Sequence, residues 1–370
     1  VVRGPAVVPE GRDGVRLKYV VAEGPRYRVG SVSVEGVTRF PTQDIARLVR
    51  LTPGAPAAQS AIDRVSEAIG DYYGNRGYVG VQVRPVIEAD PPSGVANIRF
   101  VVREGEPARI RDILIRGNVI TRENVIRREL AVAPGEPFHR GRLRISENRI
   151  RNLGYFSHVS LTPQPTDDPS QQDLVVEVVE DRMGTAEAGV AFSSVDRIVG
   201  RVEVGHGNVD LTSWPPFGGG QKARVGALFG TRRQDYYLQF VEPYLFDRRL
   251  RLTVDLFSRE SRYFSSLYDV SRRGGQILLE HPLTSFLTLG VGYNLERIEI
   301  SDVDEAASEE IRAEEGARIK SSGELSLAFD TRDRLRLTTR GNYTRLSAEL
   351  AGGPFGGDTQ WYKLHLRTHQ

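Results

Sequence analysis

The stretch Arg249-Leu-Arg-Leu-Thr-Val-Asp-Leu256 has an aliphatic side chain at every second position and a polar or charged one between them. Successive side chains of a β-strand point to opposite faces, so this alternation predicts a strand with one apolar and one polar face. The pattern recurs from residue 184 onward, without helical stretches. We expect about ten strands, at residues 184–194, 198–208, 220–231, 234–242, 249–260, 267–280, 286–300, 318–330, 336–350 and 359–368.

A soluble antiparallel sheet and a transmembrane β-barrel both give such alternation. Repetition, strand length and aromatic content favour the barrel, whose connections are short on the periplasmic side and longer outside. Short connections are expected at residues 242–248, 282–285 and 331–335. If the first strand rises from the periplasm, the long acidic loop at residues 301–317 falls outside. The loop at residues 209–219 falls inside, where Trp214 and Phe217 are either membrane-interface residues or parts of a packed turn.

The first half of the chain contains a repeat at an offset of 81 residues, from Arg28 to Arg109. In each copy an alternating segment ends at a glycine, Gly36 or Gly117, which predicts a strand followed by a turn. Two expected helices and two closing strands follow, and a threonine able to cap the first helix opens it. The sequence therefore predicts α+β units of β-α-α-β-β order. The opening threonines are Thr42 and Thr121.

Two helices on one face of a small mixed sheet would leave the edges of that sheet exposed. Exposed edges either need protection or capture an extended peptide by strand addition, and a rigid spacer is the alternative interpretation. A third copy of the closing strand, at residues 17–24, predicts that the chain begins inside an earlier unit.

Composition excludes several classes of protein. The chain has 370 residues, 39% of them hydrophobic, which argues against wholesale disorder. A net charge of +2 with scattered basic residues gives no footprint for nucleic acid, and the absence of cysteine excludes disulfides and cysteine-ligated metals. No apolar run is long enough for a transmembrane helix. The start at Val1 and a final strand with no onward partner lead us to expect a fragment whose barrel is incomplete.

Several motifs together resemble one family. Arg116-Gly-Asn-Val-Ile-Thr121, Gly135-Glu-Pro-Phe138 and Leu153-Gly-Tyr-Phe156 are similar to the membrane-proximal POTRA domain of the BamA family of outer-membrane assembly factors. The stretch Tyr236–Phe246 resembles the fourth strand of its barrel. The resemblance implies the end of a preceding POTRA domain at residues 1–25, POTRA domains at residues 26–106 and 107–182, and the N-terminal part of a transmembrane β-barrel at residues 183–370.

The resemblance implies a function in the outer membrane, with the POTRA domains in the periplasm. The family folds and inserts barrel proteins without ATP, by opening a seam at which the first strand templates the client. The expected partners are unfolded β-barrel clients, accessory lipoproteins and outer-membrane lipid, and no cofactor is expected. Arg128 and Glu129 match a family position that contacts a partner lipoprotein, and solvated helix charges are the alternative. The candidate residues of the first strand are Gly184, Ala186, Ala188, Gly189 and Ala191.

No enzyme motif is present in the sequence. Gly-x-Ser-x-Gly, His-Glu-x-x-His and Walker A patterns do not occur, and the six histidines are dispersed. The acidic residues of the loop at residues 301–317 form either a weak divalent-ion site or a solvated surface, and the solvated surface is favoured. We therefore predict that the chain is not an enzyme and holds no metal.

Two other functions are compatible with the pattern. A two-partner-secretion transporter passes one substrate through the barrel, but such proteins carry two POTRA domains, whereas the third closing strand argues for more. A diffusion channel or structural barrel with periplasmic anchoring domains would have its first strand firmly paired. A disulfide across the seam would block client insertion and leave conductance intact, which distinguishes the last reading.

Overall fold

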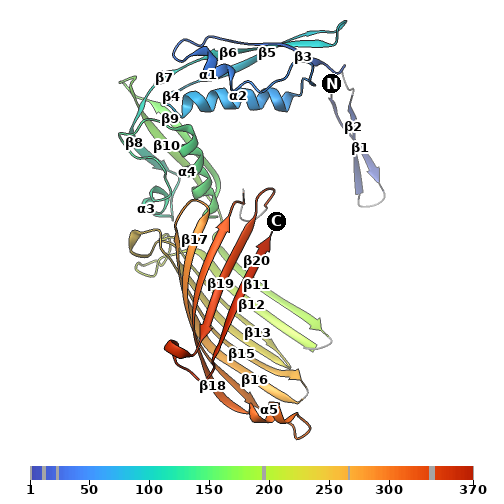
Figure 1. Ribbon diagram of the computed structural model, residues 1–370, viewed down its shortest axis with the longest axis vertical. Helices are drawn as coiled ribbons and strands as arrows, with labels where there is room; N and C mark the ends of the chain where they lie inside the picture. Colours follow the sequence, from blue (N-terminus) through green and yellow to red (C-terminus); the bar gives the residue numbers. More distant parts are fainter. Residues whose placement is uncertain are drawn as a thin grey trace. The chain divides into compact units, whose positions relative to one another are not determined.

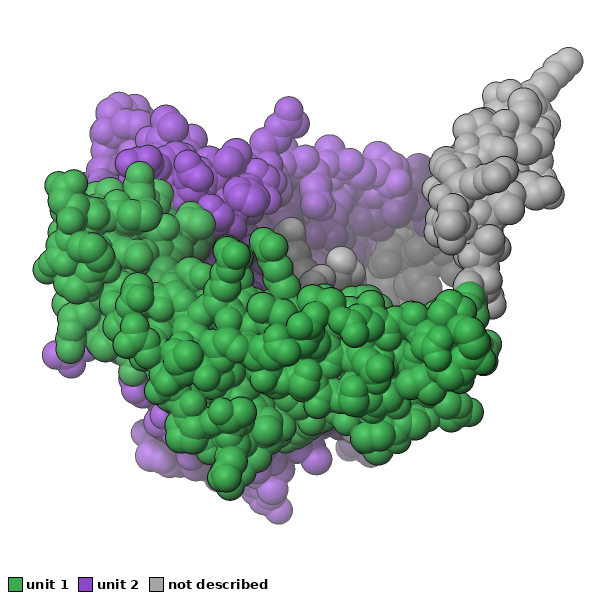
Figure 2. Space-filling view, turned by 90° about the horizontal axis from the view of Figure 1, so that it is seen from above, with its two compact units in different colours: residues 1–114, 131–146, 161–176 green, residues 115–130, 147–160, 177–370 purple. Residues whose placement is uncertain are grey.

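The computed structural model describes residues 2–10, 14–21, 25–193, 197–265, 267–332 and 338–369. The chain divides into two compact units, coloured separately in Figure 2. Unit 1 contains residues 1–114, 131–146 and 161–176, and unit 2 contains residues 115–130, 147–160 and 177–370. Within the described ranges, no helix combines the length and the apolar character needed to cross a membrane.

The first complete repeat is a three-stranded sheet with a long helix on one face (Figure 1). Strand β3 pairs in parallel with β6, and β5 pairs antiparallel with β6. Helix α2 packs on this sheet because its buried residues Ile62, Val65, Ile69 and Tyr73 recur at helical spacing. The elements are β3 (Arg28–Glu35), α1 (Thr42–Ala46), α2 (Gln59–Gly74), β5 (Gln82–Asp90) and β6 (Val95–Arg103).

The second repeat has the same order of elements, which confirms the predicted β-α-α-β-β unit. Its strands lie in the order β8-β10-β9. A short antiparallel pair was not predicted: β4 (Tyr78–Val79), which lies between α2 and β5, pairs with β7 (Glu106–Pro107), which lies between β6 and β8. The elements are β8 (Arg109–Arg116), α3 (Glu123–Arg127), α4 (Arg140–Asn152), β9 (Phe156–Pro165) and β10 (Gln171–Glu180).

A hairpin of β1 (Val2–Glu10) and β2 (Gly14–Val21) precedes the first complete repeat. Strand β2 contains the first part of the predicted third closing strand, while residues 22–24 lie outside the described residues.

The predicted threonine caps are wrong. Helix α1 has Pro41 at its N-cap and α3 has Arg122, and neither position makes a side-chain cap hydrogen bond. Both helices are only five residues long. Thr121 lies before α3, and its hydroxyl accepts a hydrogen bond from the side chain of Asn208 at 2.8 Å. The Thr121 hydroxyl therefore bonds to Asn208 of another segment instead of capping α3.

Ten antiparallel strands form one curved sheet in the order β11 to β20, which confirms the ten predicted strands (Figure 1). Each strand pairs with its neighbours in sequence, and β11 and β20 are the two edges. Over the described residues the sheet is not closed. The strands are β11 (Gly184–Ser193), β12 (Arg197–Val209), β13 (Gln221–Gly230), β14 (Arg233–Glu242), β15 (Arg251–Ser265), β16 (Tyr268–Pro282), β17 (Leu287–Ser301), β18 (Gly316–Asp330), β19 (Tyr343–Ala351) and β20 (Trp361–His369).

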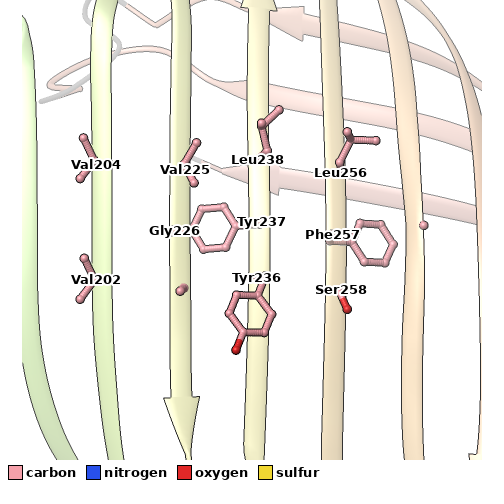
Figure 3. Close-up of a pocket in the computed structure, with 12 residues that line it drawn as sticks. Val202, Val204, Val225, Gly226, Tyr236, Tyr237, Leu238, Leu256, Phe257 and Ser258 are labelled. Carbon is pink, nitrogen blue, oxygen red and sulfur yellow. The ribbon is translucent and has the colours of Figure 1, made fainter.

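The two faces of this sheet differ in chemistry. Large apolar side chains are exposed on one face, and Figure 3 shows those of β12 to β15 side by side around a shallow hollow. The opposite face carries ion pairs, such as Glu203 with Arg201 at 2.8 Å and with Arg224 at 3.3 Å. Exposed apolar side chains on the first face include Val202, Val204, Val225, Tyr236, Leu238 and Leu256. An exposed apolar face opposite a charged one is the pattern of a membrane barrel.

The connections follow the predicted alternation only in part. The acidic loop is long and the connection at residues 283–286 is short, as predicted. The connections at residues 210–220 and 243–250, on the side where short ones are expected, are longer than the two-residue connection at 231–232 on the side expected to be outside. The acidic loop contains a short helix, α5 (Glu309–Ala313), capped by the side chain of Ser308. A 3-10 turn, η1 (Leu245–Asp247), joins β14 to β15, and a second, η2 (Gly353–Phe355), joins β19 to β20. Of the predicted short turn at residues 331–335, residues 333–335 lie outside the described residues.

Candidate functional site

Strand β11 enters the sheet as an edge strand with small side chains. It pairs along its length with β12, from Gly184 opposite His206 to Ser193 opposite Arg197. All five predicted residues of this strand are exposed. A Cβ at Gly189 would meet no atom within 4 Å, so packing does not require glycine there. Small residues leave β11 with little side-chain packing to add to its backbone hydrogen bonds.

A buried polar centre ties the start of β11 to the loop before α3. Asn208, at the end of β12, has no exposed surface. Its side-chain nitrogen donates to the Thr121 hydroxyl at 2.8 Å and lies 3.3 Å from the sulfur of Met183. Its side-chain oxygen accepts from the Gly220 backbone N–H at 2.7 Å. One asparagine therefore joins four segments that are distant in sequence.

Two carboxylates hold the loop that contains Thr121. Glu180 accepts hydrogen bonds from the backbone N–H groups of Ile120 and Thr121, at 2.9 and 2.6 Å. Burial raises the pKa of Glu180, but these hydrogen bonds outweigh it and the pKa is lowered. Asp210, in the loop after β12, pairs with Arg122 at 2.7 Å. The loop before α3 is thus fixed both to its own repeat and to the ten-stranded sheet.

The same carboxylate device occurs in the first repeat. Glu104 accepts from the backbone N–H groups of Thr38 and Arg39, both at 2.8 Å, and from the hydroxyl of Tyr73 at 2.7 Å. Burial raises the pKa of Glu104, but the hydrogen bonds dominate and lower it to about 2. Glu104 directly follows β6 and Glu180 is the last residue of β10, so both lie at the end of the closing strand of their repeat. This correspondence was not predicted from the sequence.

Glu129 lies at a buried cluster beside the turn between β14 and β15. Only 8% of the residue is exposed, and the hydroxyl of Tyr244 donates to its carboxylate. Burial raises the pKa of Glu129, against the hydrogen bond from Tyr244 and the charge of Arg128. The Arg128 guanidinium lies 4.2 Å from the centre of the Tyr244 ring, a cation–π distance. Helix α3 therefore directs both predicted residues toward this turn.

This cluster lines a cavity of about 790 Å³ at the end of the polar face of the sheet. Cations outnumber anions in its wall, so the cavity has a positive interior. Its basic residues are Arg149, Lys222, Arg249, Arg251, Arg332, Arg345 and Arg367, and its acidic residues are Glu129, Glu280 and Asp330. Within the part of the chain that the structure describes, no three metal-ligating side chains converge, and this includes the acidic residues of loop 301–317.

The repeats and the sheet each match a known family. Residues 27–105 and 108–181 match the POTRA model, described as a surface antigen variable number repeat, and residues 216–370 match the Omp85 superfamily domain. The chain belongs to the Omp85 superfamily. The resemblance to BamA-type proteins predicted from the POTRA motifs is confirmed by relatives that match over most of the chain.

Two curated relatives of this Omp85 chain illustrate the match. It is 29% identical to the outer membrane protein assembly factor BamA of Nitratidesulfovibrio vulgaris, over 95% of this chain and 44% of that protein. It is 28% identical to BamA of Neorickettsia risticii, over 97% of this chain and 47% of that protein. The chain therefore spans about half the length of the curated relatives it matches.

A solved structure shares the fold. The crystal structure of BamA from Haemophilus ducreyi lacking POTRA domains 1–3 matches with a TM-score of 0.67 at 17% identity. The match covers 92% of this chain and 66% of that one. POTRA repeats followed by an Omp85 sheet thus confirm the predicted fold class.

Sequence reasoning found the strand β11 and overlooked the residues that connect it to the second POTRA domain. Asn208 and Glu180 carry no local signal, because their partners lie in other segments. Arg128 and Glu129 both contact Tyr244. Among the hydrogen bonds of the described residues, neither of them bonds to a candidate residue of β11.

Proposed function

We propose that this chain, as part of a longer protein, folds and inserts β-barrel proteins into the outer membrane. The protein belongs to the outer membrane, with its POTRA domains in the periplasm, as in the BamA-type relatives. In this proposal the POTRA sheets dock unfolded clients, and the edge of β11 receives the first client strand. The boundaries at residues 25, 106 and 182 remain predictions.

The observation that carries the proposal is the composition of β11, an edge strand of the described sheet whose five candidate residues are glycine or alanine and are all exposed. Its backbone groups on the outer side pair with no other strand within the described residues. An unsatisfied backbone group in hydrocarbon costs several kcal/mol, so an open edge in a membrane takes up another strand. The small side chains of β11 keep that pairing reversible, which an insertase needs in order to release its client.

A crosslinking experiment in the complete protein tests the proposal. Ala188→Cys in β11 is paired with a cysteine in the terminal strand of a client barrel, and disulfide formation is followed during assembly. The matched control is Ala227→Cys in β13, where β12 and β14 occupy both edges. We expect a register-dependent crosslink from residue 188 and none from residue 227. Equal crosslinking from both positions would contradict strand templating.

The same experiment separates the alternatives. A transporter that passes its substrate through the lumen would crosslink from the polar face, for example from Arg224→Cys. A diffusion barrel would give no crosslink to a client. In our proposal the protein forms no covalent intermediate, and accessory lipoproteins and client barrels are its partners.

We also propose that helix α3 contributes to the contact with an accessory lipoprotein. Because Glu129 is buried, its part in this contact is to fix α3 through Tyr244, while the exposed side chains of the helix meet the partner. Glu129→Gln should then weaken copurification of the lipoprotein more than Glu123→Gln, which alters an exposed residue of the same helix. Equal recovery of the lipoprotein with both variants would argue against this role.

A further inference from the structure

Four large apolar side chains are exposed on two neighbouring loops of unit 2. Val119 and Ile120 precede helix α3, and Leu211 and Trp214 lie between β12 and β13. Their exposed fractions are 89%, 53%, 64% and 92%. We call these four residues the apolar loop patch. A tryptophan that is 92% exposed is costly in water, and large apolar residues exposed on adjacent loops mark an interaction surface.

The patch is held rigidly by its backbone. The Arg122 N–H donates to the Gly218 carbonyl at 3.0 Å, so the two loops are bonded to each other. The Glu180 carboxylate accepts a hydrogen bond from the backbone N–H of Ile120 at 2.9 Å. A Cβ at Gly218 would overlap the Ile120 carbonyl, so the two loops are in close contact there. The exposure of the four side chains is therefore a feature of ordered loops that press closely together.

The patch continues the apolar face of the ten-stranded sheet. Val204 is an exposed residue of that face, and His206 follows on the same face about 7 Å along the strand. Phe217, from the loop that contains Trp214, packs against His206 in a tilted arrangement, with 4.6 Å between ring centres. The loop thus begins where the lipid-facing surface ends, which is the depth at which tryptophan is enriched in membrane proteins.

Charge around the patch fits the same partner. Arg116 and Arg122 are exposed and lie close to Val119 and Ile120 in sequence. The neighbouring carboxylates, Glu180 and Asp210, are taken up by hydrogen bonds and by the ion pair with Arg122. Apolar side chains with arginines beside them suit the interface of an anionic phospholipid leaflet.

We infer that the apolar loop patch inserts into the periplasmic leaflet of the outer membrane and anchors the membrane-proximal POTRA domain there. The anchor lies beside β12, the pairing partner of β11. The anchor thus keeps the loop before α3 in contact with lipid next to the β11–β12 hairpin. The inference concerns lipid contact and does not depend on the proposed assembly function.

Spin labelling tests the inference in the complete protein reconstituted in phospholipid nanodiscs. The chain has no cysteine, so Val119→Cys and Leu211→Cys can each carry a nitroxide. Accessibility is measured to oxygen, which concentrates in lipid, and to a water-soluble nickel chelate. The control is Ile87→Cys, a branched aliphatic position that is 43% exposed on β5 of the other unit.

We expect the ratio of oxygen to nickel accessibility to be several-fold higher at residues 119 and 211 than at residue 87. The ratio at residue 119 should fall toward that of residue 87 when Trp214→Ser removes the largest member of the patch. Equal ratios at all three positions would place the patch in water and overturn the inference. Shielding of residue 119 from both reagents would mean that a protein covers the patch, which would overturn it as well.

Discussion

Asn208 has no exposed surface, and its side chain is bonded at both its oxygen and its nitrogen. Such a group is costly to leave unpaired, because burial removes the water that would otherwise bond it. Its partner Thr121 lies 87 residues away in the chain. No local pattern could predict this pair, since the sequence signal of Thr121 was that of a helix cap.

Replacing this asparagine tests the buried centre. Asn208→Ala leaves the Gly220 N–H and the Thr121 hydroxyl without their partner, and we expect a loss of about 2–3 kcal/mol in the free energy of unfolding. Denaturant unfolding of the complete protein in detergent measures it. Asn124→Ala, at an exposed residue of α3, should change stability by less than about 0.5 kcal/mol. Similar losses for the two variants would contradict the role of Asn208.

Glu104 gives a prediction about acid stability. Its pKa is lowered from the ordinary value of 4.5 to about 2, so its hydrogen bonds stabilise the repeat fully above pH 4.5. This stabilisation is lost as the pH falls from 4.5 toward 2. Glu104→Gln should therefore unfold more easily than the wild type at neutral pH, by about 1–3 kcal/mol, and match it near pH 2. A difference that persists unchanged at pH 2 would rule out the titration of Glu104 as its source.

The strands were the elements most readily predicted. Period-two alternation predicts a sheet with one apolar and one polar face, and it located all ten strands of the Omp85 sheet. The predicted ends agree within five residues, except that β19 was predicted to begin at residue 336 and begins at Tyr343. The POTRA helices were predicted in the correct order, but the segments predicted for the first helix of each repeat, residues 42–51 and 121–130, are longer than α1 and α3. Their apolar residues continue past Ala46 and Arg127 in turns that also pack inward, so apolar spacing alone did not mark the helix ends.

Strand β11 carries a prediction about the strength of its pairing. A side chain at Gly189 has open space, so Gly189→Ala should strengthen the β11–β12 hairpin by roughly 0.5–1 kcal/mol through reduced chain entropy. If client insertion requires this hairpin to move, the rate of insertion into vesicles should fall. The matched control is Gly226→Ala in β13, where a Cβ would lie 2.2 Å from the Tyr237 ring and should destabilise the sheet. A faster insertion rate with Gly189→Ala would contradict the proposal.

At the scale of unit 1, two arginines of α4 join the two repeats, because Arg140 and Arg144 both pair with Asp71 of α2. A Cβ added to Gly74 of α2 would lie 2.8 Å from the Cβ of Arg140, at the start of α4. The aliphatic part of the arginine therefore packs directly against this glycine. The Arg140 guanidinium pairs with Asp71 at 3.3 Å. The Asn75 side chain accepts from the Gly141 N–H at 2.9 Å, so the end of one helix holds the start of the other.

This joint predicts a loss of rigidity when Arg140 is removed. Arg140→Ala takes away both the packing against Gly74 and the ion pair with Asp71. The distribution of distances between spin labels at residues 64 and 142, measured by double electron–electron resonance, should broaden. The control, with the same pair of labels, is Arg151→Ala, which removes an ion pair with Glu147 inside α4. A distribution as narrow as that of the wild type would show that other contacts fix the joint.

The paired carboxylates Glu104 and Glu180 have a consequence for secretion. Each one closes a loop of about sixty residues inside its own repeat and reaches no other repeat. If the chain is translocated into the periplasm from its N-terminus, the first repeat can therefore complete its hydrogen bonds and fold before the second repeat has been translocated. The repeats then fold in the order in which they are translocated. The strands of the ten-stranded sheet, which follow them in the chain, are translocated after both POTRA repeats have folded.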